Sequence, residues 1–356
     1  MPYISKQRLS ETPVNFIIGS PRSGTTLLTT ILNANNEVLC LPETKFILTF
    51  YQKFAHQHPI NPFFADTFNS YTALRYQKLN QRQEVLLWDY DKDVYFKFDA
   101  QELKNLTYAE LMTLLMLNMS MKGKDNNAVK LVVDKEPDYT FWVKTLLSIY
   151  PNAKFLVAMR DYRSVVLSKK ESGRRIKNVS FHAYEWLKYG ETIISLQQQY
   201  PERIKLIHYE QMVLNTEQQV KEICSFFNLT YDQSMLKPHE KIHIQQDSLQ
   251  KNVSDRDQKR IGDLIKPINA SRIEAWKNKL SANEIADIEN ICGKVGKNFG
   301  YQPTTKISQR KQLQVWLINF PYIVIGMVYH YLLNNVYYYL PFAWRKWGVK
   351  YLGLGR

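Results

Sequence analysis

The feature that most constrains this chain lies near its start, where an apolar run leads through a glycine-bounded loop into a helical pattern. Residues 14–18 (VNFII) have the composition of a buried parallel strand, and residues 25–33 (TTLLTTILN) carry apolar side chains at helical spacing. Residues 19–24 between them form a turn, so the sequence predicts a strand–loop–helix unit. Because the backbone N–H groups that open a helix have no partner within it, such a loop is suited to binding an anion.

The loop has the GxxxxG spacing of a nucleotide-binding P-loop but not the residues that follow it. A P-loop NTPase has Lys and then Ser or Thr after the second glycine, and here Thr25 stands in the place of that Lys. Arg22 supplies a positive charge instead. We therefore expect residues 19–26 (GSPRSGTT) to hold a terminal anion, and we regard the loop as a poor site for a magnesium-dependent kinase. A glycine turn without a ligand is the alternative interpretation of the loop taken alone.

Apolar runs and helical patterns alternate along the rest of the chain. Further strands are expected at 131–133, 154–159 and 204–208. Helices are expected at 108–119, 140–149, 164–171, 181–198, 217–227, 271–276 and 281–295. Such alternation predicts an α/β fold with a P-loop-like central parallel sheet flanked by helices. In these sheets ligands bind at the carboxyl ends of the strands, where each motif described here is located.

Bulk properties limit the compartment and the partners. The three cysteines lie far apart without a CxxC motif, which indicates a reducing compartment rather than a disulfide framework or a zinc site. The first residues lack the pattern of a signal peptide, so a cytoplasmic location is expected. Of the net charge of +14, nine charges follow Glu289, the last acidic residue. The remaining excess is mild, and a polyanionic nucleotide accounts for it without a nucleic-acid partner.

Two further polar patterns follow the predicted strands. Arg160 stands directly after the strand at 154–159 and Ser168 two helical turns later, so the two side chains can converge on one phosphate. Lys135 lies in the turn after the strand at 131–133, and Glu43 lies in the segment LPETKF. Alone, each of these residues also has an ordinary interpretation as a surface or turn residue.

Together these motifs resemble the sulfotransferases that use 3′-phosphoadenosine 5′-phosphosulfate (PAPS). The loop is most similar to the PRSGTT loops of the tyrosylprotein, carbohydrate and bacterial branches, and the stretch HYEQMV at 208–213 resembles the YEQLV of the tyrosylprotein branch. The segment LIKPIN at 264–269 is similar to that branch as well. The resemblance covers about residues 14–303, whereas residues 50–125, where the acceptor site of the family usually lies, match nothing specific.

The resemblance implies roles for individual residues. It assigns Glu43 as the catalytic base, places Lys135 near the bridging oxygen of the donor, and makes Arg22 a further catalytic charge. The expected donor-binding residues are Arg22, Ser23, Gly24, Thr25, Thr26, Arg160, Ser168, Tyr209 and Lys266. No metal is required. Since cytosolic relatives use a histidine base, His56, His58 and His182 remain open as alternatives to Glu43.

The expected reaction is transfer of a sulfuryl group from PAPS to an acceptor hydroxyl, leaving 3′-phosphoadenosine 5′-phosphate (PAP). A hydrophobic alcohol such as a sterol or lipid is the first expectation for the acceptor, and a carbohydrate, tyrosine or phenol hydroxyl is the alternative. Outside this class, the alternatives are a P-loop small-molecule kinase and a non-catalytic nucleotide-binding module. Thr25 argues against the kinase, and Glu43 with Lys135 argues against the pure binder.

Residues 304–356 form a basic, aromatic-rich tail after the predicted catalytic domain at 1–303. No charged residue occurs from 312 to 344, yet Asn319, Pro321 and His330 make the apolar stretch too polar for a transmembrane helix. Tyrosines and tryptophans then stand beside Arg345 and other cations, which favours peripheral contact with the inner membrane face. Helices packed on the domain or across a homodimer are the alternative.

Overall fold

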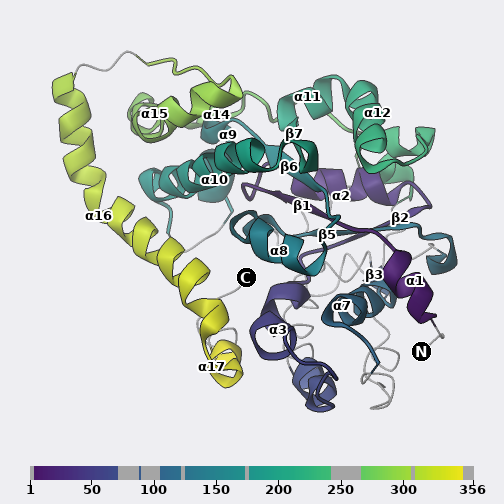
Figure 1. The fold of residues 1–356 in the computed structure, drawn as a ribbon. Coiled ribbons are helices and arrows are strands. Elements are labelled where there is room, and N and C mark those ends of the chain that lie inside the picture. The colour runs from purple at the N-terminus through teal and green to yellow at the C-terminus, as the bar shows by residue number, and fades with distance from the viewer. Residues whose placement is uncertain are drawn as a thin grey trace, which may run out of the picture.

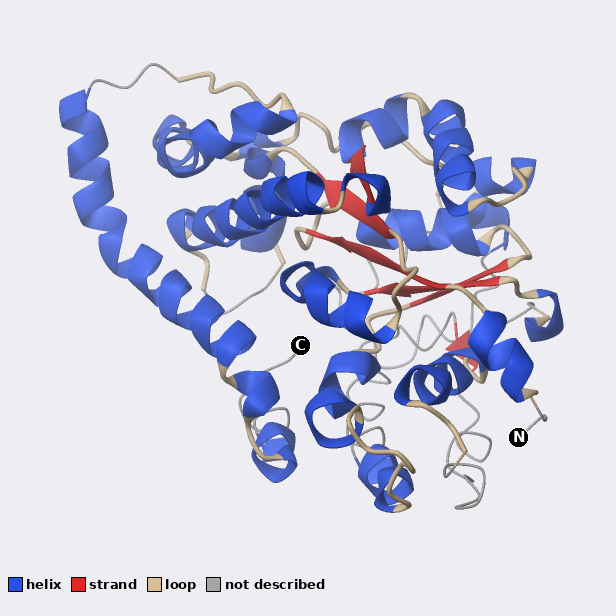
Figure 2. Ribbon diagram, in the orientation of Figure 1, coloured by secondary structure: helices blue, strands red, loops and turns tan. Residues whose placement is uncertain are grey.

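The computed structural model describes residues 4–70, 88–89, 105–121, 125–172, 176–241, 266–305 and 309–347. Its centre is a parallel sheet of five strands in the order β2-β5-β1-β6-β7 (Figure 1). The strands are β1 (Val14–Gly19), β2 (Val38–Leu41), β5 (Leu131–Lys135), β6 (Phe155–Met159) and β7 (Ile204–His208). Helices cover both faces of the sheet (Figure 2), which confirms the predicted α/β class. A short antiparallel pair, β3 (Trp88–Asp89) and β4 (Ser120–Met121), lies apart from it.

Apolar side chains leave the sheet on both faces. Phe16 and Ile18 of β1 pack into one core and Ile17 packs into the other, because successive strand residues point to opposite faces. The first core is covered by α1 (Lys6–Glu11), α3 (Phe46–Phe54), α7 (Tyr108–Leu117), α8 (Val143–Ile149), α9 (Tyr162–Lys170), α10 (Val179–Gln199) and α15 (Ala282–Gly296). The second core is covered by α2 (Thr25–Asn33), α11 (Tyr209–Leu214) and α12 (Thr216–Phe227).

Most of the predicted elements are present, two of the predicted helices differ, and one strand of the sheet was not predicted. The sequence prediction misses β2, a strand of only four residues. The helix expected at 140–149 begins as a 3₁₀ turn at Pro137–Trp142 and becomes α-helical only from Val143, with Pro137 opening the turn where its missing N–H costs no bond. At the start of α15, Ser281 and Glu284 form a capping box, in which each side chain accepts a hydrogen bond from the other residue's backbone N–H group.

The helix expected at 271–276 is wrong. The chain turns there, and the helical residues are those of α14 (Trp276–Lys279). The backbone carbonyls of Arg272 and Ile273 accept hydrogen bonds from the side chains of Arg160 and Ser164. Carbonyls engaged in this way are drawn toward β6 and α9, and the turn therefore serves the site rather than a local helix.

The tail is a long helix, α16 (Gln309–Asn335), followed by a 3₁₀ turn at Tyr337–Tyr339 and by α17 (Phe342–Trp347). It runs along one side of the molecule beside α10 (Figure 1) and ends near α3, where Arg345 of α17 donates a hydrogen bond to the carbonyl of Thr49. Within the described residues, no helix is both long and apolar enough to cross a membrane.

Candidate active site at the carboxyl edge of the sheet

All five strands of the sheet deliver a predicted site residue at the same edge. β1 ends at Gly19 and leads into the loop, and β5 ends at Lys135 itself. The remaining residues directly or closely follow β2, β6 and β7, and they are Glu43, Arg160 and Tyr209. Since the strands are parallel, their carboxyl ends meet at one edge, which is where ligands of such sheets bind. The missed strand β2 is thus the element that carries Glu43 to the site.

The loop after β1 is shaped by two residues in the left-handed region. Arg22 has a φ of 76° and Gly24 a φ of 90°, and they flank Ser23. A non-glycine residue in this region carries a conformational cost of roughly 1–2 kcal/mol, so its presence points to a functional constraint. The helix α2 opens directly after the loop without a side-chain cap, so the N–H groups of its first turn are available to an anion. The loop therefore has the backbone of an anion cradle.

Two buried polar atoms at this edge have no hydrogen-bond partner among the residues that the structure describes. One is the hydroxyl of Ser23 and the other is Nε of Arg160. Ser23 and Arg160 are 2% and 7% exposed, and leaving such groups unsatisfied costs about 1–3 kcal/mol each. Their orphaned atoms are the observation that a bound, oxygen-rich ligand would explain.

The side chain of Tyr209 joins the loop to Arg160. Its ring lies against Gly24, where a Cβ atom would come within 2.6 Å of the ring, so a larger residue is excluded there. The guanidinium of Arg160 stacks over the same ring at 4.2 Å from its centroid. Burial lowers the pKa of Arg160 below its ordinary value, and Tyr209 and Glu210 oppose that shift. A cation held in this way is stabilised by an anion placed beside it.

Arg22, in the loop after β1, contacts Ser168, in α9. Nε of Arg22 donates a hydrogen bond of 2.9 Å to the Ser168 hydroxyl, and Arg160 donates one of 3.5 Å to the carbonyl of Arg22. The loop and the second motif therefore form one continuous surface. The sequence pairs Ser168 with Arg160, whereas the hydrogen bond that the structure gives Ser168 comes from Arg22.

Glu43 and Lys135 meet on the other side of the loop. Nζ of Lys135 lies 2.8 Å from Oε1 of Glu43. The lysine side chain is 3% exposed and the glutamate side chain 29%, so the pair is open to solvent from the carboxylate side only. A carboxylate that is oriented by a buried cation and still reachable from outside is suited to accept a proton from a bound hydroxyl.

A second lysine lies beneath this pair and was not anticipated from the sequence. Lys45 is buried in a left-handed conformation, with Nζ 3.0 Å from Asp138 and 3.7 Å from Glu136. Burial would raise the pKa of Asp138, but Lys45 and the hydroxyl of Tyr189 hold it below its ordinary value. The signal in the sequence was the alternation of acids at 134, 136 and 138 around Lys135, since buried acids require a second cation.

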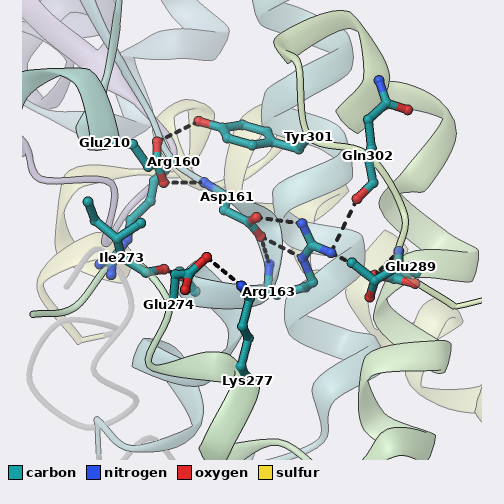
Figure 3. A network of polar contacts seen from close by, with 12 residues as sticks. Arg160, Asp161, Arg163, Glu210, Ile273, Glu274, Lys277, Glu289, Tyr301 and Gln302 are labelled. Carbon is teal, nitrogen blue, oxygen red and sulfur yellow. Dashed lines mark hydrogen bonds and ion pairs between the residues drawn. The ribbon is translucent and has the colours of Figure 1, made fainter. Parts of the chain in front are cut away.

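Arg163, one helical turn after Arg160, is the centre of a separate network (Figure 3). It makes a bidentate pair with Asp161, an ion pair of 2.7 Å with Glu289, and stacks over Trp276 at 4.1 Å. Burial alone would lower the pKa of Arg163, but Asp161 and Glu289 raise it above its ordinary value. Glu289 also accepts hydrogen bonds from the backbone N–H groups of Thr304 and Thr305.

The network reaches the site through Asp161. Its backbone N–H donates to Oε1 of Glu210, and Oε2 of Glu210 accepts from the Tyr301 hydroxyl at 2.9 Å (Figure 3). Tyr301 in turn lies 3.0 Å from Nδ1 of His208, the last residue of β7. These contacts tie β6, β7 and the segment after α15 together behind Arg160 and Tyr209. Of the residues in this arrangement, the sequence predicts a site role only for Arg160 and Tyr209.

The other predicted residues are placed as follows. Thr25 and Thr26 open α2 directly above the loop. Lys266 is exposed, and the structure shows no contact between it and Arg160 or the loop within the described ranges. His182 is fully buried beneath α9, where Glu185 and the carbonyl of Ile176 engage its two ring nitrogens, so it is a poor candidate for the base.

His56 and His58 are exposed after α3, where the ring of His56 contacts Tyr51. The structure shows no contact between either histidine and Lys135 among the described residues. Much of the expected acceptor region at 50–125 lies outside those residues. Within them, no group of three or more His, Cys, Asp or Glu side chains is arranged to hold a metal ion.

Comparison with known proteins gives the same picture of the fold. The model of the Sulfotransferase family matches residues 13–233. The sulfotransferase domain of the Synechococcus PCC 7002 olefin synthase superposes with a TM-score of 0.51 at 18% identity, covering 82% of this chain and 95% of that domain. The sulfotransferase domain of the curacin biosynthetic pathway has the same TM-score at 20% identity, with 82% and 98% coverage.

Among curated proteins, the chain is similar to protein-tyrosine sulfotransferases. It is 23% identical to that of Drosophila melanogaster over 299 residues, which is 82% of this chain and 52% of the relative. It is 24% identical to protein-tyrosine sulfotransferase 1 of Danio rerio over 298 residues, with 82% and 73% coverage. The chain thus spans about half the length of the Drosophila relative.

Proposed function

The chain belongs to the sulfotransferase family, and from this premise we propose that it transfers a sulfuryl group from PAPS to the hydroxyl of a tyrosine in a protein or peptide. The observation that carries the proposal is the pairing of Glu43 and Lys135 beside the anion cradle, at the edge where all five strands end. Membership of the family argues against the two alternatives that the loop alone left open, a kinase and a non-catalytic binding module.

The site residues fit PAPS as the donor. Ser23, with its orphaned hydroxyl, and the N–H groups that open α2 would bind the sulfuryl and 5′-phosphate oxygens, with Arg22 beside them. Arg160, with its orphaned Nε, and Ser168 would bind the 3′-phosphate. Tyr209 offers its ring as a wall for the nucleotide. A contribution of Lys266 stays a prediction from the sequence.

Glu43 and Lys135 divide the chemistry of the transfer. The acceptor oxygen forms a bond to sulfur while the bond from sulfur to the bridging phosphate oxygen breaks, and the donor supplies only the activated sulfuryl group. Glu43 accepts the proton of the attacking hydroxyl, and Lys135 stabilises the negative charge left on the phosphate. Positioning by the loop and by Arg160 keeps attacking and leaving oxygens in line.

The relatives favour tyrosine over the sterol or lipid that the sequence alone suggested. The Drosophila and Danio relatives are protein-tyrosine sulfotransferases, and their similarity covers 82% of the chain. A hydrophobic alcohol is the second candidate, because exposed apolar side chains of α16 and α17 would bring the protein close to lipids.

A transfer assay with labelled PAPS tests the proposal. The purified chain is offered tyrosine-containing peptides, the same peptides with Phe in place of Tyr, and then sterols, lipids and glycans. Label should enter the tyrosine peptides only. Transfer to a sterol or lipid with none to tyrosine would establish the second candidate, and equal labelling of the Tyr and Phe peptides would show that tyrosine is not the acceptor.

The base is tested by Glu43→Gln, which keeps the shape of the side chain and removes its basicity. We expect kcat to fall about a thousandfold, within the range for loss of a general base, while binding of PAP is retained. Glu37→Gln is a matched control, since Glu37 also pairs with a lysine, Lys130, and its side chain is 28% exposed. That pair lies just before β2 and β5, at the opposite edge of the sheet, so Glu37→Gln should keep full activity. Near-normal turnover of Glu43→Gln would refute the assignment of the base.

A further inference from the structure

The helix α16 turns polar and small residues toward the protein and large apolar residues toward solvent. A surface helix normally turns an apolar stripe toward the protein and its polar residues toward water. In α16 the residues buried against the domain include Asn319, Gly326 and His330, one of them small and two of them polar. The apolar residues face outward, and they include Phe320, Ile325, Met327, Val328, Tyr331 and Leu332.

The inner stripe is fitted to the domain by specific contacts. Nδ2 of Asn319 donates to Asp287 at 3.1 Å. At Gly326 a Cβ atom would come within 2.9 Å of the ring of Tyr184 on α10, so the glycine permits the close approach. The ring of His330 lies 5.6 Å from Phe141 and 6.0 Å from Tyr189. The contacts of its inner face therefore position α16 on the domain. The apolar side chains of its outer face are not needed for this and require a different explanation.

Exposed apolar side chains lie along the outer face of α16 and also at the end of the tail. Its six residues named above are 44–63% exposed, and Tyr339, Trp344 and Trp347 beyond them are 55–67% exposed. Figure 1 shows α16 at the side of the molecule, with its outer side turned away from the other elements. Large apolar side chains gathered on one exposed helix face mark an interaction site.

Charge identifies the occupant. After Glu289 the sequence holds nine Lys or Arg residues and no acid, and residues 312–344 carry no charge. Arg310 and Lys311 belong to the first turn of α16 and Lys346 to α17, so in the sequence positively charged residues precede and follow the apolar stretch. Two copies of the chain would bring these like charges together, whereas an anionic lipid surface complements them.

Tryptophan and tyrosine beside cations are also the residues preferred where a membrane meets water. We propose that the outer face of α16 and α17 lies in the interfacial layer of an anionic lipid bilayer and holds the catalytic domain at that surface. Arg345, which the sequence assigned to lipid contact, takes no part, because it is buried and bonded to Thr49.

Vesicle flotation with the full chain tests this inference independently of sulfate transfer. The wild type should float with vesicles of phosphatidylglycerol and phosphatidylcholine, less with phosphatidylcholine alone, and less at high salt. The variant I325Q/V328Q/L332Q should lose about tenfold or more of its partitioning, because three apolar side chains no longer enter the lipid. Leu214→Gln is the control, since Leu214 is 58% exposed but lies on α11, away from the tail.

Circular dichroism and the elution volume of each variant show whether it is folded and whether it associates. The proposal is overturned if the folded wild type stays with the unbound fraction at every lipid composition. It is also overturned if the wild type is a dimer that the triple substitution dissociates while neither protein binds vesicles, since a second copy would then cover the face. An equal loss of binding in Leu214→Gln would remove the role of α16.

Discussion

Two arginines one helical turn apart, at the end of β6, have opposite surroundings. Arg163 is paired with Asp161 and Glu289 and stacked on Trp276. Arg160 is buried as well, but among the described residues it forms no ion pair with a carboxylate, and its Nε has no hydrogen-bond partner. Its contacts are the ring of Tyr209 and backbone carbonyls. One cation is saturated by the protein, and the other is held ready for an anion.

This difference indicates that Arg163 stabilises the fold and that Arg160 binds a ligand. A buried charge with complete partners contributes to holding elements together, and its loss leaves other charges uncompensated. A buried charge with incomplete partners costs stability in the free protein, and a ligand can relieve that cost. We therefore expect substitutions at the two arginines to have effects of opposite kind.

The largest effect on binding is expected for Arg160→Met. Removing a buried, charge-assisted partner of a phosphate should weaken the affinity for PAP by about a thousandfold, and kcat/KM for PAPS should fall to a similar extent. The melting temperature should stay near that of the wild type, since the protein loses no ion pair. Calorimetric titration with PAP and thermal denaturation measure the two quantities. A strongly lowered melting temperature together with unchanged PAP affinity would contradict the role given to Arg160.

Arg163→Met should show the reverse. It leaves Asp161 and Glu289 buried without their cation, so we expect a loss of about 3 kcal/mol in the free energy of unfolding. At a temperature where the variant is folded, its affinity for PAP should stay within a few-fold of the wild type. Urea denaturation and PAP titration on the same preparation test this, and a loss of affinity as large as that of Arg160→Met would remove the distinction.

The sequence was sufficient to predict four of the five strands and part of the site, because those signals are local. The loop, Arg160 and Tyr209 each follow an apolar strand directly, so the order of elements alone places them at the carboxyl edge. The roles of Glu43 and Lys135 rested on resemblance, and the strand that positions Glu43, β2, is too short to give a clear pattern.

The remaining parts of the site depend on contacts between residues far apart in the chain. Lys45 meets Asp138 across the end of β5, and Arg163 meets Glu289 on a helix more than a hundred residues later. No local propensity encodes such pairs. The turn at 271–275 fails as a predicted helix for the same reason, because Arg160 and Ser164 determine where its carbonyls point.

A smaller effect, on the binding side of the comparison, is expected for Ser168→Ala. The hydroxyl of Ser168 accepts the hydrogen bond of Arg22, and its loss should weaken PAP by about tenfold, the size expected for one hydrogen bond to a charged group. AMP, which lacks the 3′-phosphate, should be affected less. Ser164→Ala is the matched control on the same helix, because Ser164 bonds the carbonyl of Ile273 instead. Equal losses for PAP and AMP would show that Ser168 does not act on the 3′-phosphate.

The smallest expected effect is on the free energy of unfolding and concerns His208, which contacts Tyr301 behind Arg160. Burial lowers the pKa of His208 below its ordinary value, and Glu210 only partly opposes this. The unfolded chain therefore takes up a proton near pH 6.5, before the folded protein does, so the free energy of unfolding should fall as the pH decreases below that value. His208→Gln removes this titration and should flatten the slope between pH 7 and 5, which urea denaturation at several pH values measures. If His208→Gln keeps the slope of the wild type, the proton uptake belongs to other groups. Protonation of His208 then has no effect on the free energy of unfolding.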